Sequence, residues 1–258
     1  MKRLKLLTIL LFLLVVVAAV VFARQRDENS SNPNSRSGGD SGQQQSPFDK
    51  TLYPTDEAGS LWIVVNKGRI LPSTYVPANL VVPNVPLRLS SENPEMHLRQ
   101  DAASALEKMA ADAKTDGMNL MLASGYRSYA EQVAVYNGFV KSDGKVAADA
   151  SSARPGHSEH QTGLAADLEP ASRKCEVETC FESTPEGKWL ASNSYKYGFI
   201  IRYHKDTQSL TGYEYEPWHM RYVGDSLSAQ LKNDSQTLEQ FFGLPTYPDY
   251  PAQMVQLK

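Results

Sequence analysis

Two short segments constrain the fold of this chain more than any other feature, because they place metal-binding side chains far apart in the sequence. The first is Gly156-His-Ser-Glu-His-Gln-Thr-Gly-Leu-Ala-Ala-Asp-Leu168, and the second is Glu216-Pro-Trp-His219. Both contain imidazole and carboxylate groups, which a catalytic zinc takes as ligands. We therefore predict that the chain folds so that His160, Asp167 and His219 meet around one metal ion.

The first segment is predicted to continue as a strand over residues 162–168, which the chain enters through Gly163. Side chains alternate between the two faces of a strand. One face therefore carries Asp167 with only glycine and alanine beside it, which leaves room for a metal and a substrate. His160 lies just before the strand and can fold over this open face. The other face is apolar and suited to a core, with Leu164, Ala166 and Leu168.

The second segment cannot be a helical HExxH site, because Pro217 fixes its own φ, lacks an N–H and pushes Glu216 toward an extended conformation. A turn or an edge strand is expected instead. In an extended run, His219 and Arg221 share one face. The opposite face then carries the side chains suited to packing, which are Trp218, Met220 and Tyr222.

This set of groups indicates a hydrolase. A catalytic zinc takes three protein ligands and leaves its fourth position to water, whereas a structural zinc site closes with four ligands that usually include thiolates. The chain has two cysteines, and neither lies near these histidines. With three nitrogen and oxygen ligands, Glu216 is left free to carry a proton from the activated water to a leaving amine.

Several motifs occur in the order of a known family. They are Ser158-x-His160-x-x-Gly163-x-Ala165-x-Asp167, Glu216-x-x-His219, Ser124-Gly-Tyr-Arg-Ser-Tyr129 with Gln132, Val65-Asn-Lys67 with Leu71-Pro72, and Gly198-Phe-Ile-Ile-Arg-Tyr203. Over residues 61–224 the chain thus resembles the VanY-like D-alanyl-D-alanine carboxypeptidases, which belong to the LAS zinc metallopeptidases of peptidoglycan. The resemblance implies an α+β fold in which a small antiparallel sheet carries the zinc site and helices flank it. It also implies removal of the C-terminal D-alanine from peptidoglycan stem peptides.

The resemblance assigns further residues to the site. Arg127 would hold either the terminal carboxylate of the substrate or the developing oxyanion, because a guanidinium can donate bidentate hydrogen bonds to either group. From its position alone, a surface ion pair explains Arg127 as well. The predicted substrate contacts are Ser158, Gln132, Trp218 and Tyr203, of which Tyr203 fits a core position equally well. Of the other histidines, His157 is predicted at the pocket rim, and His97 and His204 on the surface.

The alternatives are of three kinds. An L,D-carboxypeptidase that trims tetrapeptide stems to tripeptides would use the same ligands and a similar cleft. An endopeptidase that cuts crosslinks is a more distant enzyme alternative. A zinc-stabilised wall-binding module without turnover is the alternative from another class, but such a module has no use for the unliganded carboxylate of Glu216 beside the metal.

Residues 1–23 are predicted to be a membrane anchor or a cleaved signal peptide. Lys2, Arg3 and Lys5 precede an uncharged apolar run over residues 6–23. A run of this length just spans a bilayer, which favours a retained anchor over cleavage after Ala23. In both cases the rest of the chain is expected outside the cytoplasm, with the membrane as a partner if the anchor is retained.

The remainder divides into two parts. Residues 24–46 contain no Ala, Val, Ile, Leu, Met, Phe, Tyr or Trp and are predicted to be a disordered linker. Residues 47–258 have an ordinary size for one domain, here the zinc carboxypeptidase domain. A net charge of −3 with no basic stripe argues against nucleic acid as a partner and leaves the peptidoglycan stem peptide as the expected one.

Apolar spacing predicts the remaining elements of this domain. Strands are expected over residues 61–65, 119–123 and 199–204, and helices over residues 94–116, 129–140, 187–197, 225–231 and 235–242. Residues 213–222 bring in Glu216 and His219. Cys175 and Cys180 enclose four residues of a polar loop. Because an exported domain meets a disulfide-permissive environment and a C-x4-C zinc site needs a second pair, we predict a disulfide that braces this loop beside the cleft.

Overall fold

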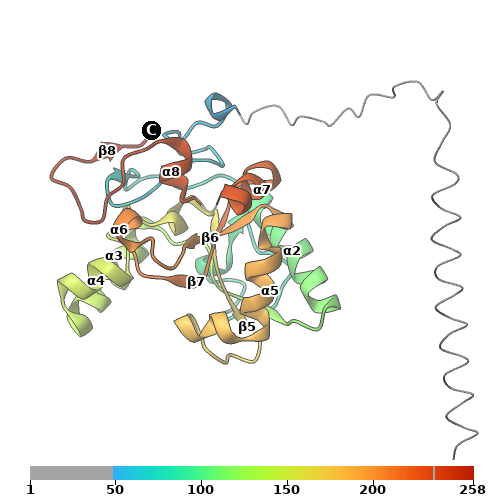
Figure 1. The fold of residues 1–258 in the computed structure, drawn as a ribbon. Coiled ribbons are helices and arrows are strands. Elements are labelled where there is room, and N and C mark those ends of the chain that lie inside the picture. Colours follow the sequence, from blue (N-terminus) through green and yellow to red (C-terminus); the bar gives the residue numbers. More distant parts are fainter. Residues whose placement is uncertain (1–48, 235) are drawn as a thin grey trace, which may run out of the picture. The chain divides into compact units, whose positions relative to one another are not determined.

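A four-stranded antiparallel sheet lies at the centre of the fold (Figure 1). The computed structural model describes residues 49–234 and 236–258. In the order in which they pair, the strands are β4 (Leu120–Ser124), β5 (Ala165–Pro170), β7 (Glu216–Tyr222) and β6 (Phe199–Tyr203). The predicted α+β class with a small antiparallel sheet flanked by helices is confirmed.

Two strand pairs and several helices surround this sheet. The parallel pair is β1 (Arg69–Ile70) with β8 (Val255–Gln256), and the antiparallel pair is β2 (Leu80–Val81) with β3 (Leu98–Arg99). The α-helices are α2 (Gln100–Thr115), α3 (Tyr129–Asp143), α4 (Lys145–Ser151), α5 (Pro185–Asn193), α6 (Gln208–Thr211), α7 (Asp225–Asp234) and α8 (Leu238–Phe242). The 3-10 turns are η1 (Lys50–Leu52), η2 (Pro94–Met96), η3 (Glu159–Thr162), η4 (Thr179–Ser183) and η5 (Ser194–Tyr197).

The alternation along β5 separates the core from the functional face, as predicted. Leu164, Ala166 and Leu168 are fully buried in the main hydrophobic cluster. Leu106 of α2 and Leu190 of α5 belong to the same cluster, so these two helices cover this face of the sheet. The carboxylate of Asp167 is therefore left on the opposite face.

The predicted strand over residues 61–65 is wrong, although Ile63, Val64 and Val65 are fully buried. Arginine side chains take the place of a neighbouring strand there. Arg221 donates to the carbonyl oxygens of residues 61 and 63 at 2.8 and 2.9 Å, and Arg69 donates to the carbonyl oxygen of Val64 at 2.8 Å. Because these carbonyls are satisfied by side chains, the segment is buried without a strand partner.

The predicted helix over residues 94–116 is wrong in its first turns. The chain forms η2 and then β3 before α2 begins at Gln100. Arg99 donates its N–H to the carbonyl of Gly163 at 2.9 Å, and the carbonyl of His97 accepts from Tyr126 at 2.7 Å. These long-range bonds take the backbone groups that a helix would use. His97 is accordingly half-buried and not at the start of a helix.

Other boundaries differ less. The predicted strand over residues 162–168 begins at Ala165, because Thr162 still belongs to η3. The turn or edge strand expected at Glu216 is instead the start of β7, which is an inner strand of the sheet. The segment 187–197 divides into α5 and η5, and α8 begins only at Leu238, after the capping residue Thr237. The other predicted elements agree to within three residues at each end.

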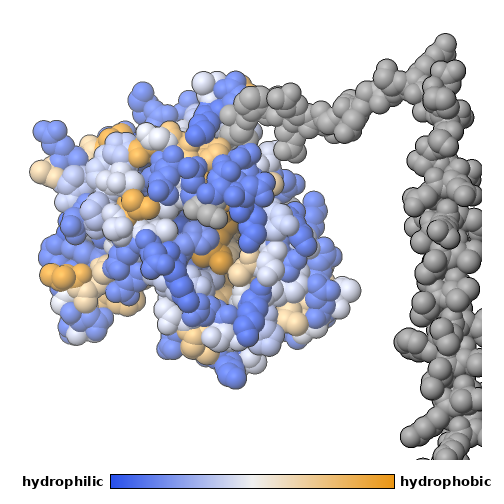
Figure 2. Space-filling model, in the orientation of Figure 1, coloured by the Kyte–Doolittle hydropathy of each residue, from blue (hydrophilic) through white to orange (hydrophobic). Residues whose placement is uncertain are grey.

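The predicted anchor over residues 1–23 and the predicted linker over residues 24–46 lie outside the described residues. Among residues 49–234 and 236–258, no helix combines the length and apolar character needed to cross a membrane. The face of this part of the chain seen in Figure 2 is mainly hydrophilic, with small and separate hydrophobic patches.

Candidate active site

The pairing of β5 with β7 brings the two distant sequence segments together. Asp167 lies directly opposite His219 in the register of these strands. His219 Nδ1 is 3.1 Å from Asp167 Oδ1, and His160 Nε2 is 3.3 Å from Asp167 Oδ2. Ligand atoms of the three residues lie within 4.8 Å of one another, and all three residues are buried. The predicted meeting of these side chains is confirmed.

His160 reaches this position because of the turn that precedes β5. Ser158 caps η3, and its hydroxyl accepts a hydrogen bond from the N–H of His160 at 3.3 Å. Gly163 ends the turn in the left-handed region with φ 68°, where a side chain would also crowd Leu80. The Nδ1 of His160 donates to the carbonyl of Gly125 at 2.6 Å, so that Nε2 faces Asp167.

The electrostatics of the cluster fit a bound cation. Burial alone would raise the pKa of Asp167, but the two imidazoles lower it well below its usual range. Burial alone would lower the pKa of His219, but the neighbouring carboxylates of Asp167 and Glu159 raise it to about 10. Two imidazoles and a carboxylate whose ligand atoms converge form a nitrogen and oxygen donor set that suits zinc.

Glu216, the first residue of β7, stands beside this donor set. Its Oε2 is 3.6 Å from His219 Nδ1, and its side chain is 13% exposed. Burial raises the pKa of Glu216 to about 8, and the charge of His219 opposes this shift. A carboxyl group in this position can exchange protons with a molecule bound in the cleft.

The cluster opens into a cleft of about 280 Å³. Every residue predicted for the site lines it, namely His160, Asp167, His219, Glu216, Arg127, Ser158, Gln132, Trp218 and Tyr203. The sequence did not identify several other lining residues, which are Val135, Phe139, Ser151, Ser152, Ala153, Glu159, Val177 and Tyr213. Val135 and Phe139 follow Gln132 at helical spacing, which is a usable signal. The others come from the end of α4 and from loops and turns, which carry no such signal.

Arg127 lies between β4 and α3 and lines the cleft, not the outer surface. Its guanidinium donates to Ser124 Oγ at 2.8 Å and to Gln132 Oε1 at 3.0 Å. Its closest carboxylate among the described residues is that of Glu95, at 4.0 Å. The surface ion pair considered for Arg127 is therefore not what fixes this side chain.

Gln132 has both ends of its amide engaged within the protein. It is 1% exposed, accepts from Arg127, and donates to the carbonyl of Ala153 at 2.7 Å. This geometry favours a role in orienting Arg127. Direct contact of Gln132 with a substrate stays a prediction.

The aromatic residues and the remaining histidines divide between cleft and core. Tyr203 is 5% exposed, and its ring centroid is 5.1 Å from that of His219, so it is both a buried residue and a cleft wall. Trp218 packs against the hydrophobic cluster as well as lining the cleft. His204 is exposed, as predicted. The predicted rim position of His157 is wrong, because this residue is 2% exposed and its ring is 2.8 Å from the carbonyl of Asn66.

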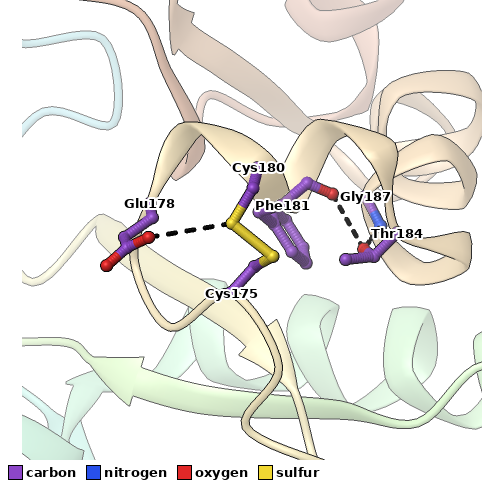
Figure 3. The surroundings of a disulfide bond; sticks show 6 residues. All are labelled: Cys175, Glu178, Cys180, Phe181, Thr184 and Gly187. Atoms are coloured by element: carbon purple, nitrogen blue, oxygen red, sulfur yellow. Dashed lines mark hydrogen bonds between the residues drawn. A yellow bond between two sulfur atoms is a disulfide. The ribbon is translucent and has the colours of Figure 1, made fainter.

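Cys175 and Cys180 form a disulfide with their Cα atoms 5.6 Å apart (Figure 3). Val177, inside the loop that they close, lines the cleft, which confirms the predicted place of this loop. Immediately after it, Phe181 is fully buried and Thr184 caps α5 by accepting from the N–H of Gly187 at 3.0 Å. The disulfide therefore joins the two ends of the loop, and the buried Phe181 fixes the chain that follows it in the core.

Replacing both cysteines, as Cys175→Ala with Cys180→Ala, is expected to lower the free energy of unfolding by about 2 kcal/mol. The reason is that the crosslink removes loop-closure entropy from the unfolded chain, modestly for so short a loop. Urea denaturation followed by circular dichroism measures the difference. Wild-type protein treated with reductant should lose a similar amount, and equal stability of the oxidised wild type and the double variant would contradict the expectation.

Comparison with known proteins gives a consistent result. The sequence profile of the VanY family, described as D-alanyl-D-alanine carboxypeptidase, matches residues 95–225. The putative carboxypeptidase YodJ of Bacillus subtilis (strain 168) is 44% identical over 179 residues, which are 69% of this chain and 66% of YodJ.

Solved structures agree in fold. The LD-carboxypeptidase LdcB, whose structure concerns peptidoglycan recognition, has a TM-score of 0.69 and 41% identity, covering 73% of this chain and 88% of LdcB. The vancomycin-resistance D,D-pentapeptidase VanY from a VanB-type cassette, solved with Zn(II), has a TM-score of 0.57 and 31% identity. That match covers 72% of this chain and 99% of the VanY chain.

Proposed function

Since this chain belongs to the VanY family of D-alanyl-D-alanine carboxypeptidases, we propose that it is a zinc-dependent carboxypeptidase that removes the C-terminal D-alanine from peptidoglycan stem peptides. The observation that carries the proposal is the convergence of His160, Asp167 and His219 within 4.8 Å in a cleft that also contains Glu216 and Arg127. Zinc is the cofactor because the donors are imidazole and carboxylate, and because a VanY relative binds Zn(II).

The ligand atoms in this proposal are His160 Nε2, an oxygen of Asp167 and His219 Nδ1. Zinc bound there would lower the pKa of its water and polarise the carbonyl of the scissile bond. The chain itself contributes the dry surroundings, because all three ligand residues are buried. Tyr203 and Trp218 add an apolar wall that limits access of bulk water to the cleft.

Glu216 moves the proton. Its carboxylate accepts a proton from the attacking water and then delivers it to the nitrogen of the departing D-alanine, so that the leaving group departs as an amine. Burial, which raises the pKa of Glu216 to about 8, favours holding the proton. A bound dication would act in the opposite direction. The two effects together suit a group that takes up and releases a proton near neutral pH.

Arg127 recognises negative charge. Ser124 and Gln132 hold two of its nitrogens, so the guanidinium has a fixed direction at the cleft. Either the terminal carboxylate of the stem peptide or the oxyanion that forms during attack would satisfy it.

Replacing Arg127 by alanine is expected to lower activity, with a signature that separates these two roles. If Arg127 stabilises the oxyanion, kcat should fall by about 10²–10³-fold. If it binds the terminal carboxylate, KM should rise, and the variant should stop distinguishing a free C-terminus from an amidated one. Steady-state kinetics on both peptides measure this. Arg173→Ala, at an exposed arginine near the cleft loop, is the control and should behave as wild type.

A second candidate is an L,D-carboxypeptidase that trims tetrapeptide stems to tripeptides. It is favoured by the similarity to LdcB, which is more nearly identical to this chain than the VanY of known structure. Both activities release one D-alanine and differ only in the configuration of the residue before the cut.

Mass spectrometry of synthetic stem peptides tests the proposal. The protein is incubated with a pentapeptide and with a tetrapeptide, with and without chelator. Chelator-sensitive loss of one alanine from the pentapeptide supports the D,D activity, and loss from the tetrapeptide supports the L,D activity. Cleavage only of a crosslinked dimer would indicate an endopeptidase. Peptides left intact under all conditions would contradict the enzyme and leave the zinc-stabilised wall-binding module.

The proposed place of action is outside the cytoplasmic membrane. The basic residues at the start of the chain and the apolar run over residues 6–23 are typical of a segment that sends the following chain across a membrane. We favour a retained anchor. The predicted linker over residues 24–46 would then let the catalytic domain reach the wall.

A further inference from the structure

The carboxylate of Glu159 is buried on the side of His219 that faces away from Asp167. Glu159 lies between Ser158 and His160 in the sequence, and its side chain is 0% exposed. Its Oε1 accepts hydrogen bonds from Arg202 Nε at 2.9 Å and from Arg221 Nη1 at 2.8 Å. Its Oε2 has no hydrogen-bond partner among the described residues and lies 3.5 Å from His219 Nε2.

His219 presents its two ring nitrogens to different surroundings. Nδ1 faces Asp167 at 3.1 Å and Glu216 at 3.6 Å. Nε2 is buried, makes no hydrogen bond within the described part of the chain, and has Glu159 Oε2 as its neighbouring acceptor. A neutral imidazole that binds a metal through Nδ1 carries its proton on Nε2. A buried N–H left without an acceptor is costly, and the 3.5 Å separation needs only a small closure to form the bond.

We propose that Glu159 is a positioning residue for His219: its Oε2 accepts the Nε2 proton and so fixes the tautomer that leaves Nδ1 free to bind zinc. This inference rests on the ligand role proposed above for His219. His160 has the corresponding arrangement with its two ring nitrogens exchanged. Its Nδ1 donates to the carbonyl of Gly125, and its Nε2 faces the site. Acceptors of this kind hold ligand imidazoles in register with the metal.

The surroundings of Glu159 keep it in place. Arg202 also bonds to Glu239, at 3.0 Å and 2.5 Å, and Arg221 is anchored on backbone carbonyls of the segment 61–63. Two buried cations thus face two buried carboxylates, and none of the four side chains is exposed. Paired in this way the charges are tolerated inside the protein. Of the two carboxylates, those of Glu159 and Glu239, that of Glu159 is the one that lies beside His219.

This difference supplies a matched pair of variants. Glu159→Gln and Glu239→Gln each remove one buried negative charge beside Arg202, and both keep the size of the side chain while replacing one acceptor oxygen by an amide donor. Glu159→Gln is expected to raise the zinc dissociation constant by about 10–100-fold, measured by competition with a fluorescent chelator. Glu239→Gln should bind zinc as wild type does. Equal weakening in both variants would assign Glu159 a merely structural role and overturn the inference, as would wild-type affinity in Glu159→Gln.

A measurement on the wild type keeps the test decisive if Glu159→Gln does not fold. In the zinc-loaded protein, ¹⁵N NMR of the His219 ring should show the proton on Nε2 and none on Nδ1. A proton on Nδ1 would overturn the inference. His219→Ala separates this failure from failure of the proposed function. If His219→Ala binds zinc as wild type, the ligand set itself is wrong, and if it loses zinc while Glu159→Gln does not, only the role of Glu159 is wrong.

Discussion

Glu216→Gln is expected to lower kcat by about 10²–10⁴-fold while the protein still binds zinc. The amide keeps the shape of the side chain but cannot accept the proton of the attacking water. Glu216 is 3.6 Å from His219 Nδ1 and therefore adjacent to the donor set without completing it. Turnover of the preferred stem peptide, measured together with zinc content, separates loss of proton transfer from loss of metal.

The control for this variant is Glu214→Gln. Glu214 is exposed and lies two residues before Glu216 on the same approach to β7. It should retain wild-type kcat and zinc content. A near-normal rate in Glu216→Gln would remove Glu216 from the proton-transfer role, and loss of zinc from that variant would show that the carboxylate is a ligand.

Asp167→Ala is expected to abolish turnover and zinc binding together. Asp167 is the residue on which the cluster is centred, because one oxygen faces His160 at 3.3 Å and the other faces His219 at 3.1 Å. Its removal also leaves buried imidazole nitrogens without a partner, which should lower the free energy of unfolding by about 1–3 kcal/mol. Zinc content, turnover and urea denaturation measure the three consequences.

Chelated wild-type protein provides the comparison for Asp167→Ala. It should lose activity and regain it when zinc is added back, whereas Asp167→Ala should not. Glu169→Gln tests whether zinc binding depends on Asp167 itself or on any buried carboxylate of β5. Glu169 lies two residues further along the same face, is fully buried, and pairs with Arg88. It should keep zinc. Full activity of chelated wild-type protein would count against a metalloenzyme altogether.

Much of the site was predictable because it depends on local conformation. The alternation of side chains along residues 164–168 separates apolar residues from Asp167 whatever the rest of the chain does. Pro217 excludes a helix at Glu216. Gly163 supplies the left-handed residue that ends η3 and points the chain into β5. Each of these outcomes is decided by the residues next to it.

The wrong predictions have one physical cause, which is competition from distant partners. Residues 61–65 have a strand-like composition, but Arg221 and Arg69 occupy their carbonyls. Residues 97–99 continue a helical apolar spacing, but their backbone groups bond to Gly163 and Tyr126. Local propensity is weak compared with such satisfied long-range hydrogen bonds.

By itself, then, the sequence determined the candidate side chains and the faces on which they stand, since backbone dihedral preferences and strand alternation act over a few residues. Only the tertiary structure decided their mutual distances. The β5–β7 register sets Asp167 against His219, the junction of β4 and α3 ties Arg127 to Gln132, and burial beside two arginines directs Glu159 at His219. These contacts depend on segments that are remote along the chain and become neighbours only when the core is packed.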